Sequence, residues 1–213
     1  MIQLHDRTRR RIALAVFFTF GVMPTVAVSA WGVWRRSPWY VAGHAEQLTW
    51  RLGMDVRISG VRHPRPGVVV YEEIKVREPE NRQPVFQCEE AEIRWNESPN
   101  GSNPSGLRLI LSQPKINAAE WSEIWRLADQ LLTGRAETDD LAVQVEATAL
   151  DVGGHGLSQT LSQVLVRVAA RAGGPQIEAT FHLPDGQGEP ARIVVARNRQ
   201  VTPPTTRVDV DAR

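Results

Sequence analysis

The side chains that most often perform chemistry are scattered along this sequence and form no recognisable motif. The chain has five histidines, and no two of them have the spacing of metal ligands. The single cysteine, Cys88, excludes an intrachain disulfide and a zinc site built from cysteines. His155 lies in a glycine-rich run, but no G-x-S-x-G nucleophile motif accompanies it, so we interpret this run as a turn.

The densest group of carboxylates is Glu89, Glu90 and Glu92. On a strand, Glu90 and Glu92 share one face and Glu89 lies on the other, which favours a solvated strand over an acid–base pair. The sequence contains no phosphate loop and no dinucleotide-binding fingerprint. We therefore predict no catalytic residue, no cofactor and no metal site, and a protein that is not an enzyme.

The distribution of charge argues against nucleic-acid binding. Residues 1–36 contain six arginines and one aspartate, whereas the remaining 177 residues contain 19 basic and 23 acidic side chains. The part of the chain expected to fold is thus slightly acidic, and a nucleic-acid-binding domain would concentrate positive charge there.

Residues 12–34 predict a transmembrane helix. This stretch has 23 residues and no charged side chain, and it is long enough as a helix to cross a hydrocarbon core of about 30 Å. The basic flank at residues 7–11 outweighs Arg35 and Arg36, so we expect residues 1–11 to form a cytoplasmic tail and the rest to lie outside the cytoplasm. A cleaved signal peptide is the alternative, with Val28-Ser29-Ala30 as the possible cleavage site. Its apolar stretch is longer than usual for a signal peptide, which favours an uncleaved anchor.

The segment at 35–54 predicts a short juxtamembrane helix. Ser37 and Pro38 are suited to the N-cap and the first helical position, and Gly53 is suited to the end. Trp39 and other aromatic residues follow the apolar stretch, where amphipathic rings favour the headgroup layer.

From residue 55 onward, apolar residues recur at every second position, which predicts strands with one solvated face. Val68, Val70, Ile74 and Val76 have one parity, and a further strand is expected at 107–111. One helix is expected at 117–132, where Trp121 and Trp125 belong to an apolar stripe. That stripe could pack on the sheet or lie at a membrane interface.

Strands then follow one another from about residue 141 to 211, separated by glycine- and proline-containing turns. Short connections predict an antiparallel meander. The expected fold is therefore mainly β (α+β): an N-terminal transmembrane helix, then a long curved antiparallel sheet at 55–213 with one or two accessory helices.

The order of these elements resembles the N-terminal part of AsmA-like and TamB-like envelope proteins. The resemblance covers residues 12 to about 116, and three blocks that follow the membrane segment carry it: 52–61 (LGMDVRISGV), 66–79 (PGVVVYEEIKVREP) and 86–95 (FQCEEAEIRW). In that family the sheet rolls lengthwise into an apolar β-groove. The resemblance therefore implies a periplasmic domain on a single-pass inner-membrane anchor that transports phospholipid in envelope biogenesis. This chain is shorter than typical members.

A groove of this kind needs a continuous apolar lining and no catalytic group. The candidate lipid-contacting residues are the apolar-parity positions of three consecutive strands: Val143, Val145, Val164, Val166, Val168, Ile177, Ala179, Phe181 and Leu183. The same parity would also suit an ordinary core. The alternative function is thus a non-catalytic, membrane-anchored interaction or assembly module that contacts other envelope proteins.

Overall fold

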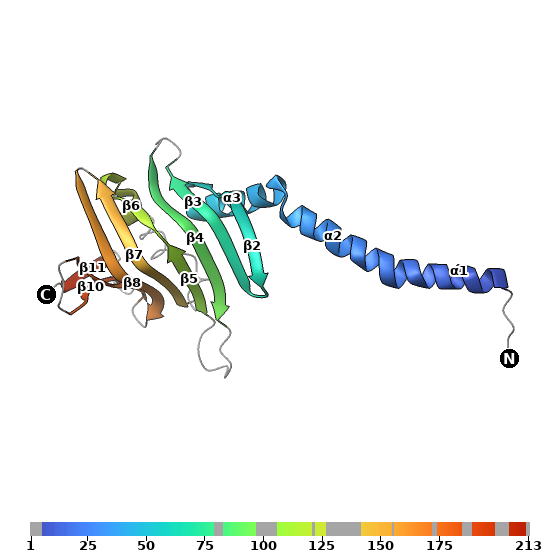
Figure 1. Cartoon of the computed structure of the whole chain (residues 1–213). Coiled ribbons are helices and arrows are strands. Elements are labelled where there is room, and N and C mark those ends of the chain that lie inside the picture. Colours follow the sequence, from blue (N-terminus) through green and yellow to red (C-terminus); the bar gives the residue numbers. More distant parts are fainter. Residues whose placement is uncertain are drawn as a thin grey trace. The chain divides into compact units, whose positions relative to one another are not determined.

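The structure is a computed structural model whose contacts divide the chain into two units, Met1–His44 and Ala45–Arg213 (Figure 1). Each unit is described here by itself. The residues that the structure describes are 6–78, 83–96, 106–120, 122–126, 142–154, 156–171, 174–184, 189–198 and 205–211.

The first unit contains the helix expected to cross a membrane. Helix α1 (Asp6–Phe17), a π-helical turn η1 (Phe18–Val22) and helix α2 (Met23–Arg35) follow one another without a break. The π-turn ends two residues before Pro24, whose nitrogen cannot donate a backbone hydrogen bond and whose ring disturbs the preceding turn. Residues Arg7–Arg35 form the one described helix that is long and apolar enough to cross a bilayer. The predicted span of 12–34 lies within it.

Helix α3 (Pro38–Leu52) has the ends that the sequence predicts. The backbone N–H of Tyr40 donates to Ser37 Oγ at 3.3 Å, which satisfies one of the free donors of the first turn. Gly53 adopts a φ of +64°, and its N–H donates to the carbonyl of Thr49 at 2.8 Å, so the helix ends at a left-handed glycine.

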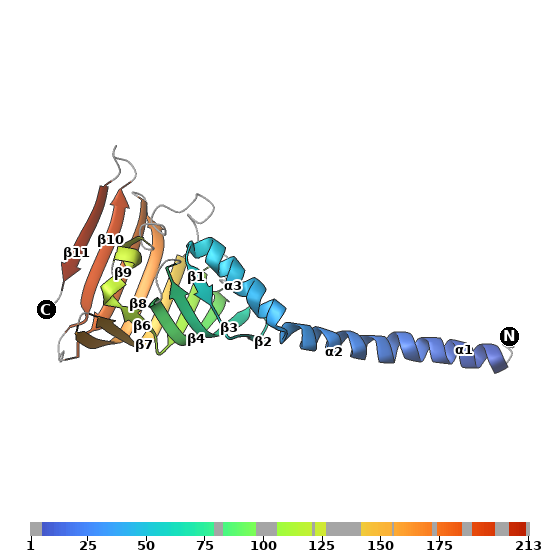
Figure 2. The same ribbon diagram turned by 90° about the horizontal axis from the view of Figure 1, so that it is seen from above.

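The second unit is built on one mixed sheet (Figure 2). Its described strands are β1 (Asp55–Arg57), β2 (Gly60–Arg65), β3 (Val68–Arg77), β4 (Pro84–Asn96), β5 (Gly106–Ser112), β6 (Lys115–Asn117), β7 (Ala142–Gly154), β8 (Leu157–Arg171), β9 (Gly174–His182), β10 (Ala191–Asn198) and β11 (Thr205–Asp211). The main order is β1-β3-β4-β5-β7-β8-β9-β10-β11, with β2 beside β3 and β6 between β4 and β7.

The antiparallel meander predicted after residue 140 is present from β7 to β11. An antiparallel arrangement throughout was wrong, however, because β5 and β6 both pair with β7 in parallel. A parallel neighbour requires a connection long enough to return to the start of the sheet. The segment from 118 to 141 has that length, whereas the turns later in the chain are short.

The helix predicted at 117–132 begins later than expected. Asn117 ends strand β6, in which Ile116 pairs with Phe86, and Asn117 Oδ1 accepts a hydrogen bond from the N–H of Ala119. A 3₁₀ turn (Ala118–Glu120) and helical residues 122–126 follow. The remainder of the predicted helix, like Trp121, lies outside the described residues.

The best-buried core lies at the N-terminal end of the sheet. Its members come from the loop before β1 and from β1, β3 and β4, and Met54 and Val85 have no exposed surface. Leu48 and Leu52 of α3 and Ile124 pack against this cluster. The helical cover that the structure describes is therefore concentrated over the first strands.

Candidate functional site

The registers of the sheet align its apolar residues into rows that run across the strands. Residues paired directly across neighbouring strands point to the same face. One row, which we call the first row, consists of Trp95, Leu107, Val143, Val168, Ile177, Val195 and Val208. The second row consists of Val69, Ile93, Leu109, Val145, Val166, Ala179, Ile193 and Val210.

A third row consists of Val61, Tyr71, Ala91, Leu111, Ala147 and Val164. Every member of the three rows is apolar or aromatic. Together we call them the apolar face. The second row crosses eight strands, and at a strand spacing of about 4.8 Å it extends for about 34 Å.

The structure brings most of the candidate lining residues onto this face. Seven belong to the three rows, and Phe181 extends the face on β9, where it pairs with Ala191. Leu183 lies beyond the end of β9 and is 40% exposed. The seven row members are Val143, Val145, Val164, Val166, Val168, Ile177 and Ala179.

The sequence prediction missed the members that other strands contribute. Leu107 and Leu109 of β5 and Val208 and Val210 of β11 continue the rows on both sides of the predicted lining. The same two-residue period marks these positions in the sequence. Their membership of the face depends on the registers, which that period alone does not give.

A line of irregular residues crosses the sheet and keeps this face apolar along the strands. Glu73 in β3, Gln113 after β5 and Gln163 in β8 have positive φ angles of 48°, 49° and 51°. In the register of β3 and β4, Glu73 lies opposite Glu89. Gln113 follows Ser112, which is the partner of Glu90, so Glu73, Glu89 and Gln113 lie on adjacent segments of the sheet. Gln163 faces Thr148 farther along the same line. We call this line the seam.

At the seam, the spacing between successive apolar residues along a strand lengthens once from two residues to three. The pairs that flank it are Tyr71 and Ile74, Cys88 and Ala91, Leu111 and Pro114, Ala147 and Leu150, and Leu161 and Val164. The first two pairs belong to one buried cluster, so they lie on the same side of the sheet. The registers of β3 with β4 and of β7 with β8 continue through this step without a shift, so the paired strands change faces together.

The seam corrects one prediction. Val68 and Val70 were expected to share a face with Ile74 and Val76. They pair instead with Arg94 and Glu92, while Ile74 and Val76 belong to the cluster that contains Tyr71. The positive φ of Glu73 separates the two halves of the strand.

The apolar face is only partly covered on the later strands. Val143, Val145, Val166, Val168 and Ile177 are half-buried, whereas Ala147, Val164 and Val195 are buried. Within the described part of the chain, every strand belongs to this one sheet, so no second sheet closes over them. The helical residues that pack on the buried cluster contact its members near β1, β3 and β4.

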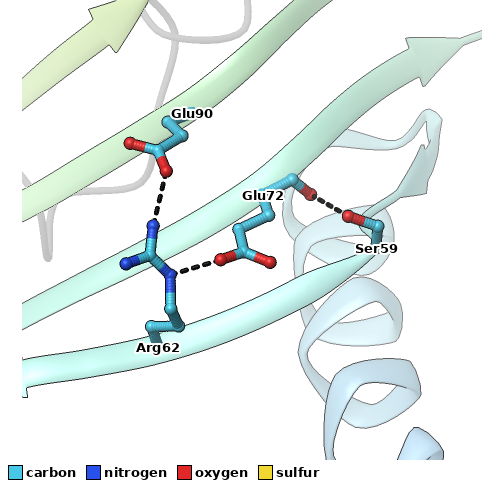
Figure 3. A network of polar contacts seen from close by, with 4 residues as sticks. All are labelled: Ser59, Arg62, Glu72 and Glu90. Carbon is cyan, nitrogen blue, oxygen red and sulfur yellow. Dashed lines mark hydrogen bonds and ion pairs between the residues drawn. The ribbon is translucent and has the colours of Figure 1, made fainter.

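The opposite face is mixed: Val68 and Val70 are buried on it beside charged residues, and its ion pairs link neighbouring strands. We call it the charged face. Arg62 of β2 donates through Nε to Glu72 of β3 and through Nη2 to Glu90 of β4, and Ser59 Oγ donates to the Glu72 carbonyl at 3.2 Å (Figure 3). Farther along, Arg108 Nη2 of β5 is 2.6 Å from Glu146 Oε2 of β7. Hydrogen bonding from Arg108 lowers the pKa of Glu146, and hydrogen bonding from Arg94 lowers the pKa of Glu92.

Among the described residues, the cysteine is buried and the side chains that could bind a metal are dispersed. Cys88 is buried, and this desolvation raises the pKa of its thiol to about 11, so the thiolate needed for reactivity is scarce at neutral pH. The described residues contain no group of three or more histidine, cysteine or carboxylate side chains that could hold a metal. An open depression of about 240 Å³ beside the seam is lined mainly by polar and charged residues, among them Glu73, Gln113 and Lys115.

Comparison with known proteins identifies no relative: no family model matches the chain, and no curated protein is significantly similar to it. The features of this chain that bear on function are the two faces of the sheet and the helix at Arg7–Arg35.

Proposed function

We propose that this protein is a membrane-anchored envelope protein of the AsmA-like type that binds phospholipid, or conducts it, along the apolar face. The observation that supports this most strongly is the continuity of the rows. The second row holds eight apolar residues on eight strands, and no charged residue interrupts it.

Such a face suits an acyl chain because the chain needs continuous apolar cover and no directional contact. Each CH₂ group removed from water contributes about 0.8 kcal/mol, so a 16-carbon chain contributes on the order of 13 kcal/mol when fully covered. The side chains of the second row, most of which are half-buried, would cover one side of the acyl chain. The charged face on the other side of the sheet keeps the domain soluble.

The proposed location is the inner membrane, with residues 1–11 in the cytoplasm and the sheet in the periplasm. The basic residues before the apolar helix outnumber those after it, which favours this orientation. Under this arrangement, the apolar helix anchors the sheet at the bilayer that supplies the lipid.

The test is lipid co-purification with the full-length protein in mild detergent, measured by mass spectrometry. Val166 lies in the second row between Val145 and Ala179, so Val166→Glu places a charge in the middle of the apolar face. We expect bound phospholipid to fall at least several-fold. Gln176→Glu adds the same charge on the opposite face, where Gln176 pairs with Ala169, and should leave bound lipid unchanged.

The rival hypothesis is a non-catalytic assembly module whose apolar face is covered by a partner protein. It predicts that the wild-type protein carries no stoichiometric phospholipid and that Val166→Glu and Gln176→Glu do not differ in bound lipid. Either result would reject the lipid-binding proposal.

A further inference from the structure

In the part of the chain that the structure describes, the sheet has one edge at β1 and β2 and the other at β11, and these edges differ in how far they are protected against pairing with another strand. Edge strands present unpaired backbone groups, and proteins commonly protect them with short strands, proline, charge or bulges. At the first edge, β1 has three residues, and β2 contains Pro64 and a register shift between Arg62 and Arg65. Arg62 also forms its two ion pairs there.

The other edge, β11, is charged but has no proline, no bulge and no very short strand. Its seven residues pair in unbroken register with β10, and none of them is proline. The first and second rows end here on Val208 and Val210, which are 47% and 65% exposed. The apolar face therefore reaches this edge without a residue that ends it.

The sequence of β11 is complementary to itself. If a second β11 is placed antiparallel with Val208 opposite Val208 of the other copy, Arg207 faces Asp209 twice, and Thr206 faces Val210 twice. All seven residues then have partners, and each residue keeps its face, because paired positions have the same parity. Within one chain, Arg207 Nε already lies 2.9 Å from Asp209 Oδ1, and both side chains are more than half exposed.

Shifting one strand by two residues, the smallest shift that keeps each residue on its face, places Asp209 opposite Asp209. Like charges directly opposite each other are destabilising. The charge pattern thus favours the register centred on Val208.

From these observations we infer that two copies of this chain associate through antiparallel pairing of their β11 strands, centred on Val208. The apolar rows of the two sheets then join into one face. The membrane anchor confines both copies to the same surface, which raises their effective concentration.

The test is disulfide trapping of the full-length protein in native membranes, in a Cys88→Ala background. Opposed side chains at the centre of an antiparallel pair lie within reach of a disulfide. Val208→Cys should give a covalent dimer under mild oxidation. Val210→Cys is the matched control: it is on the same strand and face and is more exposed, but the proposed register places it opposite Thr206, so it should give little dimer.

Charge reversal tests the register independently. In the Val208→Cys background, Arg207→Asp places like charges opposite each other at two symmetric positions, and the dimer yield should fall roughly tenfold. Adding Asp209→Arg restores opposite charges and should restore the yield.

The inference is overturned if Val208→Cys forms no more dimer than Val210→Cys, if it forms a disulfide only with a different polypeptide, or if the charge reversal leaves the yield unchanged. None of these measurements involves lipid, so their outcome is independent of the proposed lipid binding.

Discussion

The conformation of Gln163 leads to a stability prediction that tests the seam. An L-residue with a left-handed backbone costs about 1–2 kcal/mol relative to its preferred conformations. Gln163 has a φ of +51° and an exposed side chain, so glycine at this position removes that cost without removing a buried contact. Glycine also has more conformational freedom in the unfolded chain, which costs about 0.5–1 kcal/mol. We therefore expect Gln163→Gly to stabilise the protein by about 0.5–1 kcal/mol.

The matched control is Gln159→Gly. Gln159 lies on the same strand, is also exposed, and has no left-handed conformation. This change should destabilise the protein by about 0.5–1 kcal/mol, because it brings the entropy cost without the relief of strain. The free energy of unfolding should thus differ between the two variants by about 1–2 kcal/mol.

The assay is urea denaturation of the full-length protein in detergent, followed by the circular dichroism of the sheet. If Gln163→Gly lowers the free energy of unfolding as much as Gln159→Gly does, the seam does not hold a left-handed residue at 163. The seam would then not explain the three-residue spacing between Leu161 and Val164 in β8.

Three further predictions concern the core and the charged groups. Val85→Ala, at a side chain with no exposed surface, should lower the free energy of unfolding by about 2 kcal/mol in the same assay; an unchanged midpoint would contradict the assigned core. The burial that raises the pKa of Cys88 to about 11 should keep its alkylation by iodoacetamide slow from pH 7 to 9, whereas the denatured protein should react quickly; fast reaction of the native protein would show an accessible thiolate. Because Arg108 lowers the pKa of Glu146 in the folded state, the stability from the ionised carboxylate is present at neutral pH and is lost as the pH falls through that lowered pKa; Arg108→Met should flatten this acid-side decline, and an unchanged pH profile would reject the coupling.

The local elements were predictable because their signals are local. Ser37, Pro38 and Gly53 define the ends of α3 by capping chemistry that operates within one turn. The two-residue period after 140 likewise gives strands with one apolar face. The same reasoning placed β7 to β11 in an antiparallel meander, because the turns between them are short.

The arrangement of the sheet depended on pairings that the sequence pattern does not contain. The parallel contact of β5 with β7 reflects which strand lies beside which after a long connection. The seam was missed for a related reason: a three-residue step such as Tyr71 to Ile74 looks like an imperfect alternation in one strand. The seam can be recognised only when the registers show that neighbouring strands have the same three-residue step at aligned positions.

The most direct test of the central proposal is photocrosslinking from two adjacent positions on β9 in living cells. Ala179 lies on the apolar face. Its neighbour Glu178 lies on the charged face, where it forms an ion pair with Arg192. A photoreactive phenylalanine analogue is introduced at each position, and covalent lipid adducts are measured by mass spectrometry of the purified protein. The proposed function predicts phospholipid adducts from position 179 and few or none from position 178. Equal labelling from both positions, or adducts from 179 with protein alone, would contradict it.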